Sequence, residues 1–296
     1  MNVLLAGSVS SSLAALEGLL RGGVEITGVL GLDDSLASRI ADYRSLQGPA
    51  EVAGLPFHSF EKISEPAVEE FVHAHRPDLL WAIGLSQIVP NRLIQIARHG
   101  AVGFHPTMLP KGRGRAPVAW TILLGQSAAA NLFFLTEEPD AGDIIIQREV
   151  PVRPDDYAED LIARTNQVLV QAIIELSPFI KSGQLPRTPQ NHSKATHYPK
   201  RTAADGRIDW GQGTDTIYRL IRAAGRPYPG AFTTLDGRRM TVWRARPATK
   251  EQIAKAAMAC DPGSVIRVDP TMGLLMRTGD GGLWLTETEM ATSGHR

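Results

Sequence analysis

The chain has 296 residues, enough for two domains of ordinary size, and 43% of them are hydrophobic and 21% charged, as in globular proteins. This composition excludes a disordered or fibrous chain. Lysine plus arginine and aspartate plus glutamate both number 31, so the formal net charge is zero, which argues against nucleic acid as a partner.

The single cysteine, Cys260, excludes an internal disulfide and a multi-cysteine metal site, which favours a reducing compartment. The amino-terminal residues lack a basic start, so no signal peptide is expected. No apolar run approaches the ~20 residues of a membrane-spanning helix. His73 and His75 lie near a predicted helix end and point in different directions, so no metal site is expected. These features predict a cytoplasmic protein without a metal and without membrane association.

The first half of the chain alternates strand-like and helix-like patterns. Residues 2–6 form an apolar run, after which leucines recur at helical spacing. Further buried strands are predicted at 25–31, 79–83 and 101–104, with helical segments between them. This alternation predicts an α/β fold with a Rossmann-like, mostly parallel sheet.

Two β-rich runs follow within residues 131–152, separated by a Pro-Asp-Ala-Gly-Asp turn. Apolar residues at helical spacing over 161–176 predict a long helix that closes a first domain, residues 1–183. Residues 184–205 are polar and punctuated by prolines, as in a linker. In residues 206–296 a helix precedes five β-type segments joined by Asp-Gly or glycine-rich turns, which predicts a small, OB-like β-barrel domain.

The turn after the first strand, "GSVSSS", contains one glycine, so it is neither a dinucleotide fingerprint nor a phosphate-binding loop. The helix that follows it could still bind a small anion at its amino end, where backbone N–H groups are free. An ordinary capped helix is the alternative. The sequence leaves both open.

His105 and Asp140 form the strongest candidate pair for chemistry. Each follows a predicted strand, and ligands gather at the carboxyl ends of strands in an open parallel sheet. A histidine beside a carboxylate has a defined tautomer, exchanges protons near neutral pH and can hydrogen-bond a developing oxyanion. A lone histidine is ordinarily structural, but prolines and glycines make this loop rigid, and Arg113 and Arg115 lie on it. We therefore expect a catalytic site here.

The segment "HPTMLPKGRGRAP", followed by a tryptophan and later by "PDAGDI", resembles the family of formyltransferases that use 10-formyltetrahydrofolate. The segment "RPDLLWAIGLSQIVP" resembles the strand and folate-lining loop of that family. "RIDW" and "IYRLIRAAGRPYPGAFT" resemble the start of the carboxyl-terminal domain of its methionyl-tRNA type. The resemblance extends over most of the chain and implies a formyltransferase with 10-formyltetrahydrofolate as the formyl donor.

In that family an Asn-x-His pair and an aspartate form the catalytic centre, and the resemblance gives the catalytic roles to His105 and Asp140. The family's asparagine falls on Gly103, which has no amide and suggests a differently shaped acceptor site. An active enzyme must then take a donor from a backbone N–H, a water, the acceptor, or a side chain such as Ser86 or Asn131.

The resemblance also implies two sets of binding residues. Those expected to bind the folate are Leu85, Ser86, Gln87, Ile88, Val89, Glu138 and Pro139. Those expected on the acceptor side are Gly7, Ser8, Gly103, Arg113 and Arg115.

The identity of the acceptor is less constrained. Residues 32–60 contain no insertion rich in lysine and arginine, which argues against a tRNA acceptor. We expect a small-molecule amine: an amino sugar attached to a nucleotide, or an amino acid such as an N-hydroxyornithine used in siderophore biosynthesis. The alternatives are a methionyl-tRNA formyltransferase, a hydrolase of formyl-folate, and, because of Gly103, a non-catalytic folate-binding module. A homodimer is compatible with the sequence.

Overall fold

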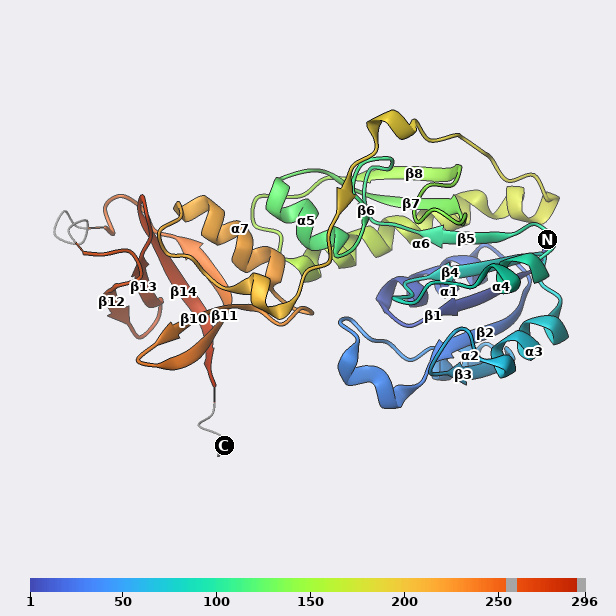
Figure 1. Ribbon diagram of the computed structural model, residues 1–296, viewed down its shortest axis with the longest axis horizontal. Coiled ribbons are helices and arrows are strands. Elements are labelled where there is room, and N and C mark those ends of the chain that lie inside the picture. Colours follow the sequence, from blue (N-terminus) through green and yellow to red (C-terminus); the bar gives the residue numbers. More distant parts are fainter. Residues whose placement is uncertain (254–259, 292–296) are drawn as a thin grey trace. The chain divides into compact units, whose positions relative to one another are not determined.

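The computed structural model describes residues 1–253 and 260–291, which belong to two compact units (Figure 1). Unit 1 comprises Met1–Pro117, Ser127–Pro151 and Ile162–Tyr198. Unit 2 comprises Val118–Gln126, Val152–Leu161 and the chain from Pro199 onward. The segment predicted as a linker is thus divided, because residues 184–198 belong to unit 1. The domain boundaries proposed at 183 and 205 stay predictions.

Unit 1 is built on a seven-stranded sheet with the strand order β3-β2-β1-β4-β5-β7-β8. The strands are β1 (Val3–Gly7), β2 (Ile26–Leu32), β3 (Phe57–Phe60), β4 (Leu79–Ile83), β5 (Ala101–Phe104), β7 (Ala128–Phe134) and β8 (Ile144–Val150). β1 to β5 are parallel, whereas β7 is antiparallel to β5 and β8 is antiparallel to β7. The mostly parallel α/β sheet is confirmed, and β4 and β5 have the predicted bounds.

Two long helices cover one face of this sheet. α1 (Ser10–Arg21) and α6 (Ala158–Ser182) bury leucine, isoleucine, valine and alanine side chains against the strands. The helices approach closely at Gly18, where an added Cβ atom would lie only 2.9 Å from Cβ of Ile173. A side chain there would push the helices apart.

Shorter helices cover the opposite face. α3 (Pro66–His75) and α4 (Asn91–Ile96) pack against β1, β2 and β4 through residues such as Val72 and Leu93. Proline at the first position of α3 fits the start of a helix, where no N–H partner is needed. The carboxyl ends of β4 and β5 therefore lie between two packed layers.

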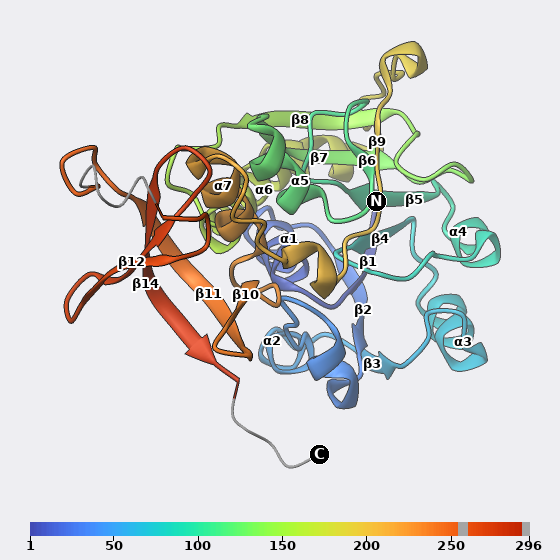
Figure 2. The same ribbon diagram turned by 60° about the vertical axis from the view of Figure 1, so that its left-hand side comes forward.

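The remaining elements are short. They are the helices α2 (Gln47–Val52) and α5 (Pro117–Leu124), the 3₁₀ helices Asp34–Arg39, His192–Lys194 and Ala203–Gly206, and the strands β6 (Arg113–Gly114) and β9 (His197–Tyr198). β6 and β9 pair in parallel, so the loop after His105 and the segment before Pro199 lie side by side (Figures 1 and 2). This pairing was not predicted.

Unit 2 contains a five-stranded antiparallel sheet with the order β10-β11-β14-β13-β12. Its elements are α7 (Thr214–Ala224), β10 (Ala231–Leu235), β11 (Arg238–Pro247), β12 (Val265–Asp269), β13 (Gly273–Arg277) and β14 (Gly282–Met290). Ile217 and Ile221 of α7 pack on Met240 and Val242 of β11. All five predicted strands and the helix are present. Within residues 199–253 and 260–291, β10 and β12 are the edge strands of this sheet. The antiparallel β domain is confirmed, and its OB-like barrel form stays a prediction.

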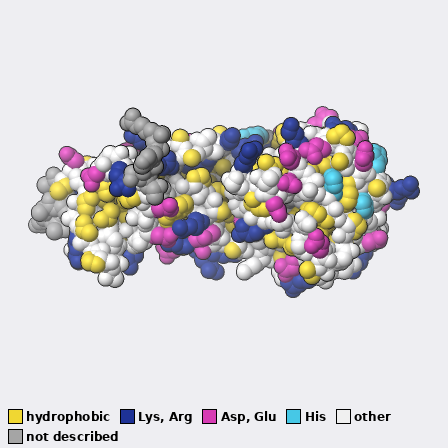
Figure 3. Space-filling view, turned by 90° about the horizontal axis from the view of Figure 1, so that it is seen from below, with side chains coloured by type: hydrophobic (Ala, Val, Ile, Leu, Met, Phe, Trp, Pro, Cys, Tyr) yellow, Lys and Arg dark blue, Asp and Glu magenta, His cyan; other side chains and the backbone are white. Residues whose placement is uncertain are grey.

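The surface agrees with the balanced composition. Acidic and basic side chains are interspersed over the face shown in Figure 3. No helix in the described ranges 1–253 and 260–291 is both long and apolar enough to cross a membrane.

Candidate active site at the carboxyl edge of the seven-stranded sheet

His105 directly follows β5, at the carboxyl edge of the sheet, and only 5% of it is exposed. Its backbone N–H donates to the carbonyl of Asn131 in β7 (3.0 Å). Its ring atom Nε2 lies 2.8 Å from the carbonyl oxygen of Gly112. Because a carbonyl can only accept, Nε2 must carry the hydrogen in this contact, so in the neutral ring Nδ1 has a free lone pair. The protein thereby selects the tautomer that can take up a proton at Nδ1.

Asp140 faces this free nitrogen. It lies in the loop between β7 and β8, in the left-handed region with φ +56°. Its Oδ2 atom accepts a hydrogen bond from the N–H of Gly114 (2.8 Å) and lies 3.6 Å from Nδ1 of His105. This second distance is too long for a hydrogen bond, but it is short enough for the carboxylate to stabilise a positive charge on the ring.

The loop that carries Gly112 and Gly114 requires glycine at both positions. They have φ values of +74° and +107°, and a Cβ atom on Gly114 would lie 2.5 Å from the carbonyl oxygen of Tyr198. The close approach allows β6 to pair with β9 and directs the Gly114 N–H toward Asp140. Burial raises the pKa of the Tyr198 phenol, so this side chain stays neutral beneath the loop.

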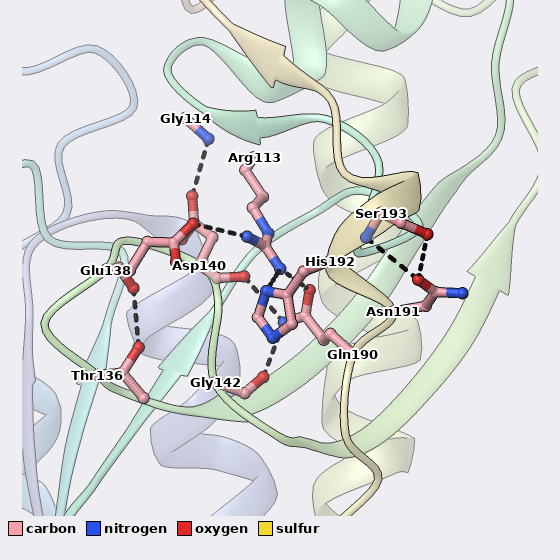
Figure 4. A network of polar contacts seen from close by, with 10 residues as sticks. All are labelled: Arg113, Gly114, Thr136, Glu138, Asp140, Gly142, Gln190, Asn191, His192 and Ser193. Atoms are coloured by element: carbon pink, nitrogen blue, oxygen red, sulfur yellow. Dashed lines mark hydrogen bonds and ion pairs between the residues drawn. The ribbon is translucent and has the colours of Figure 1, made fainter.

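Arg113 is 1% exposed, and its guanidinium donates to Glu138 (2.9 Å) and Gln190 (2.8 Å) and contacts Nδ1 of His192 (3.1 Å; Figure 4). These contacts fix the loop between β7 and β8, while the buried Nε atom of Arg113 has no hydrogen-bond partner. The expected acceptor contact of Arg113 stays a prediction. Arg115, by contrast, is exposed.

Gln190 completes this network and was not predicted. Its Nε2 atom donates to the carbonyl oxygens of Asp140 (2.9 Å) and Gly142 (2.7 Å), while its Oε1 accepts from Arg113 (Figure 4). The residue is 6% exposed. The polar, proline-rich composition around it indicated a linker. No local pattern distinguishes a glutamine that supports a site from one that is solvated.

The predicted folate loop, Leu85 to Val89, follows β4. β4 and β5 are parallel neighbours, so the loop begins beside His105. Leu85 and Val89 pack partly against the core, and Ser86 is exposed. Gln87 bonds to the protein, since its Oε1 accepts from Ile63 N (2.8 Å) and its Nε2 donates to Glu61 O (2.8 Å).

Ile88 is the outermost side chain of this loop, with 85% of it exposed. Because Ile88 belongs to the loop that begins beside His105, it offers an apolar surface to the flat ring system of a ligand such as a folate. The other predicted folate residues lie across the site: Glu138 and Pro139 are exposed next to Asp140, and the backbone carbonyl of Glu138 accepts from Thr136. Both segments expected to bind the folate therefore present exposed residues, and their role stays a prediction.

The turn between β1 and α1 is closed by its own hydrogen bonds. Ser8 is 2% exposed and its hydroxyl donates to Gly84 O (2.9 Å), while a Cβ atom on Gly7 would lie 2.2 Å from the Ser12 hydroxyl. Both are expected on the acceptor side, and that expectation stays a prediction.

An anion site at the amino end of α1 was one of the two open alternatives. Ser12 Oγ accepts from the N–H groups of Ser8 (2.9 Å) and Val9 (3.2 Å). A carboxylate oxygen of Asp42 accepts from the N–H of Ser10 (3.2 Å) and from its hydroxyl. The helix end is thus capped by the protein itself.

Gly103 is buried in β5, and the space beside it is filled. A Cβ atom there would lie 2.6 Å from Cδ2 of Leu135 and 3.0 Å from Cζ of Phe133. Its α-carbon therefore faces apolar side chains, and not an open acceptor pocket as expected. In the described part of the chain no three His, Cys, Asp or Glu side chains gather as metal ligands.

The fold and the site together define a two-part enzyme-like architecture: an α/β sheet with a His–Asp pair at its carboxyl edge, followed by an antiparallel β unit. Residues 3–176 match the formyl transferase family, and residues 200–294 match the formyl transferase C-terminal domain. The chain belongs to the formyl transferase family.

Solved structures show the same fold. HypX from Aquifex aeolicus in complex with tetrahydrofolic acid is 21% identical, with a TM-score of 0.69 over 98% of this chain and 44% of the HypX chain. A methionyl-tRNA formyltransferase from Clostridium thermocellum is 20% identical, with a TM-score of 0.62 over 85% of this chain and 94% of that one. An N-formyltransferase from Helicobacter canadensis, solved with folinic acid and dTDP-3-aminofucose, is 14% identical, with a TM-score of 0.67 over 96% and 98%. This chain thus spans less than half of HypX.

Proposed function

We propose that this protein transfers the formyl group of 10-formyltetrahydrofolate to the amine of a small metabolite. The observation that carries the proposal is the pair formed by His105 and Asp140, in which Nδ1 of the ring has a free lone pair and a carboxylate oxygen 3.6 Å away. Family membership supports formyl transfer as the reaction.

The folate would lie between the loop Leu85–Val89 and the loop around Glu138 and Pro139, with Ile88 against its ring system. When bound, it supplies an activated formyl group, whose bond to N10 breaks as the bond to the acceptor nitrogen forms and a proton passes from that nitrogen to N10. His105 takes this proton at Nδ1 from the acceptor nitrogen and passes it to N10 of the folate. Asp140 stabilises the positively charged ring between the two transfers. Gly112 and Gly114 hold both partners in place.

Two acceptor classes remain in the proposal: an amino sugar attached to a nucleotide, and an N-hydroxyornithine-like amino acid. The N-formyltransferase from Helicobacter canadensis was solved with a dTDP-linked amino sugar, which supports the first class by analogy. Exposed Arg115, on the loop after His105, offers a cation to a charged acceptor group.

The test follows tetrahydrofolate release from 10-formyltetrahydrofolate, with and without a panel of small amines and with uncharged tRNA and methionyl-tRNA. Release that requires a small amine supports the proposal. Release without any amine would identify a hydrolase, release only with methionyl-tRNA would identify the tRNA enzyme, and binding without turnover would identify a folate-binding module.

His105→Ala tests the mechanism in the same assay. We expect kcat to fall by about 10²–10⁴-fold, because the proton relay is lost. His99→Ala, at an exposed histidine between α4 and β5, is the control and should keep the wild-type rate. Full activity of His105→Ala would refute the mechanism.

A further inference from the structure

A buried amide lies beside His105 without a hydrogen-bond partner. Asn131 in β7 is 0% exposed, and neither its Oδ1 nor its Nδ2 atom has a partner. A buried polar group left unpaired destabilises the fold, so its retention calls for a compensating role. The position of Asn131 relative to the site suggests what that role is.

The β5–β7 ladder places Asn131 directly opposite His105. Gly103 pairs with Phe133, and Phe104 pairs with Leu132. The hydrogen bond from His105 N to Asn131 O (3.0 Å) continues this register and places His105 opposite Asn131. Residues opposite one another on an antiparallel ladder project to the same face, with Cβ atoms about 4.5–5.5 Å apart. The pair Gly103–Phe133 lies two positions back and therefore on the same face of the sheet. There the Cβ position of Gly103 is 3.0 Å from the Phe133 ring, so paired side chains on this face of the two strands lie close together. The Asn131 amide therefore lies next to the His105 ring.

Several other polar groups around His105 already have hydrogen-bond partners. Nε2–H of His105 donates to Gly112 O, and Gly114 N donates to Asp140. Gln147, opposite Asn131 on β8, donates from Nε2 to Leu109 O (3.1 Å). In the neutral ring Nδ1 has no hydrogen to offer. Among these groups, Asn131 Nδ2 is the donor that is still free.

We infer that Asn131 is a catalytic residue whose Nδ2 donates a hydrogen bond to the formyl oxygen as that oxygen gains negative charge. The inference rests on the proposed function. Asn131 supplies the amide that Gly103 cannot, from the neighbouring strand and two ladder positions further toward the site. His105 and Asn131 are similarly enclosed, 5% and 0% exposed, so the formyl group must enter the same closed space to meet either. A donor in such a water-excluded place stabilises a developing charge strongly.

Asn131→Leu separates this role from a structural one. Leucine has the same number of side-chain heavy atoms but no polar group, so it removes the unpaired amide without opening a large cavity. If the amide serves the reaction, the variant should unfold at a temperature equal to or above that of the wild type and yet lose about 10²–10³-fold in kcat with little change in KM.

A matched control is available in Thr165 of α6, whose buried hydroxyl also has no hydrogen-bond partner and which is 2% exposed. Thr165→Val makes the same kind of change away from His105. It should gain stability in the same way and keep the wild-type kcat.

A second readout does not depend on turnover. The carbonyl stretch of a ¹³C-formyl folate analogue bound to the wild type should lie at lower frequency than in Asn131→Leu, because a hydrogen bond weakens the C=O bond. Equal frequencies, or an Asn131→Leu variant with wild-type kcat, would overturn the inference. Failure of the proposed function would look different from failure of this inference. If the proposed function were wrong, the wild type itself would show no amine-dependent release of tetrahydrofolate, or His105→Ala would keep the wild-type rate.

Discussion

The side-chain amide of Gln190 donates to the backbone carbonyl of Asp140 at 2.9 Å, across fifty positions of the sequence. Asp140 is in the left-handed conformation, with φ +56°, a conformation that residues other than glycine adopt at a cost. Its carbonyl is fixed by Gln190 and its carboxylate by Gly114, so the orientation toward His105 is determined at both ends. A residue far along the chain thus controls the geometry of the pair formed by His105 and Asp140.

Gln190→Ala should weaken this control. It leaves the carbonyl oxygens of Asp140 and Gly142 without their donor and should destabilise the protein by about 1–3 kcal/mol, with a larger effect on kcat than on KM. The measurements are urea unfolding and steady-state kinetics. Gln184→Ala, at an exposed glutamine, is the control.

A double-mutant cycle shows whether Gln190 acts through Asp140. If it does, Gln190→Ala combined with Asp140→Asn should lower kcat no further than Asp140→Asn alone. Additive losses would mean that Gln190 affects the reaction by another route.

Arg113 and Arg115 lie two residues apart and should behave differently. Arg113→Met leaves the buried Oε1 of Gln190 without its donor, whereas the carboxylate of Glu138 stays exposed, so we expect a loss of stability of about 1–3 kcal/mol and a fall in kcat. Arg115→Met should leave the unfolding midpoint unchanged and raise only KM for a charged acceptor. Thermal unfolding and acceptor titrations distinguish the two. Equal destabilisation by both variants would contradict this assignment.

Introducing the family's asparagine at position 103 should not raise the activity of the enzyme. The side chain of Gly103→Asn would collide with Leu135, which can turn aside, and with Phe133, which is 1% exposed and cannot. We expect a loss of about 1–3 kcal/mol and no gain in kcat. Gly103→Asn combined with Leu135→Ala should recover part of the stability. A gain in kcat of an order of magnitude or more would show that the site lacks a donor and would also argue against Asn131.

The amino end of α7 should make unit 2 sensitive to acid. The N–H and hydroxyl of Thr214 both donate to Asp280 (2.8 Å each), and chiefly the backbone bond holds the pKa of Asp280 below its ordinary value of 3.8. A carboxyl whose pKa is lower in the folded state stabilises the fold above its ordinary pKa and loses that effect as the pH falls through the lowered value.

Asp280→Asn tests this pH dependence. It should lower the unfolding midpoint at neutral pH, and the difference from the wild type should shrink as the pH drops below 4. Urea unfolding between pH 7 and pH 3 measures the effect, with Asp236→Asn, at an exposed turn of the same sheet, as the control. A difference that stays constant over this range would contradict it.

The sequence predicts well those features that depend on local pattern. β4 and β5 have the predicted bounds because continuous apolar runs end at glycine or at His105. His105 and Asp140 come together as predicted, because strands that are neighbours in a sheet bring their ends to one edge.

The features that were missed depend on contacts between distant segments. Gln190 lies in a polar stretch whose composition is that of a linker, and the pairing of β6 with β9, together with the bridge between Ile144 and Thr188, brings that stretch to the site. The contacts of Arg113 were missed because an arginine on a glycine-rich loop has the same sequence pattern whether it faces a ligand or a buried glutamine. The hydrogen bond of Ser8 was missed for the same reason, since its partner, Gly84, follows a different strand.

The pairing of β6 with β9 also has a consequence for dividing the chain experimentally. A cut or a fusion point placed after residue 183, where the long helix ends and the composition turns polar, would separate Gln190, Thr196 and Tyr198 from the loops they hold. The reacting pair would then lose its support although every residue of the pair was still present. Fusion points for tags, domain exchanges or protease sites should be placed after Tyr198, where unit 1 ends.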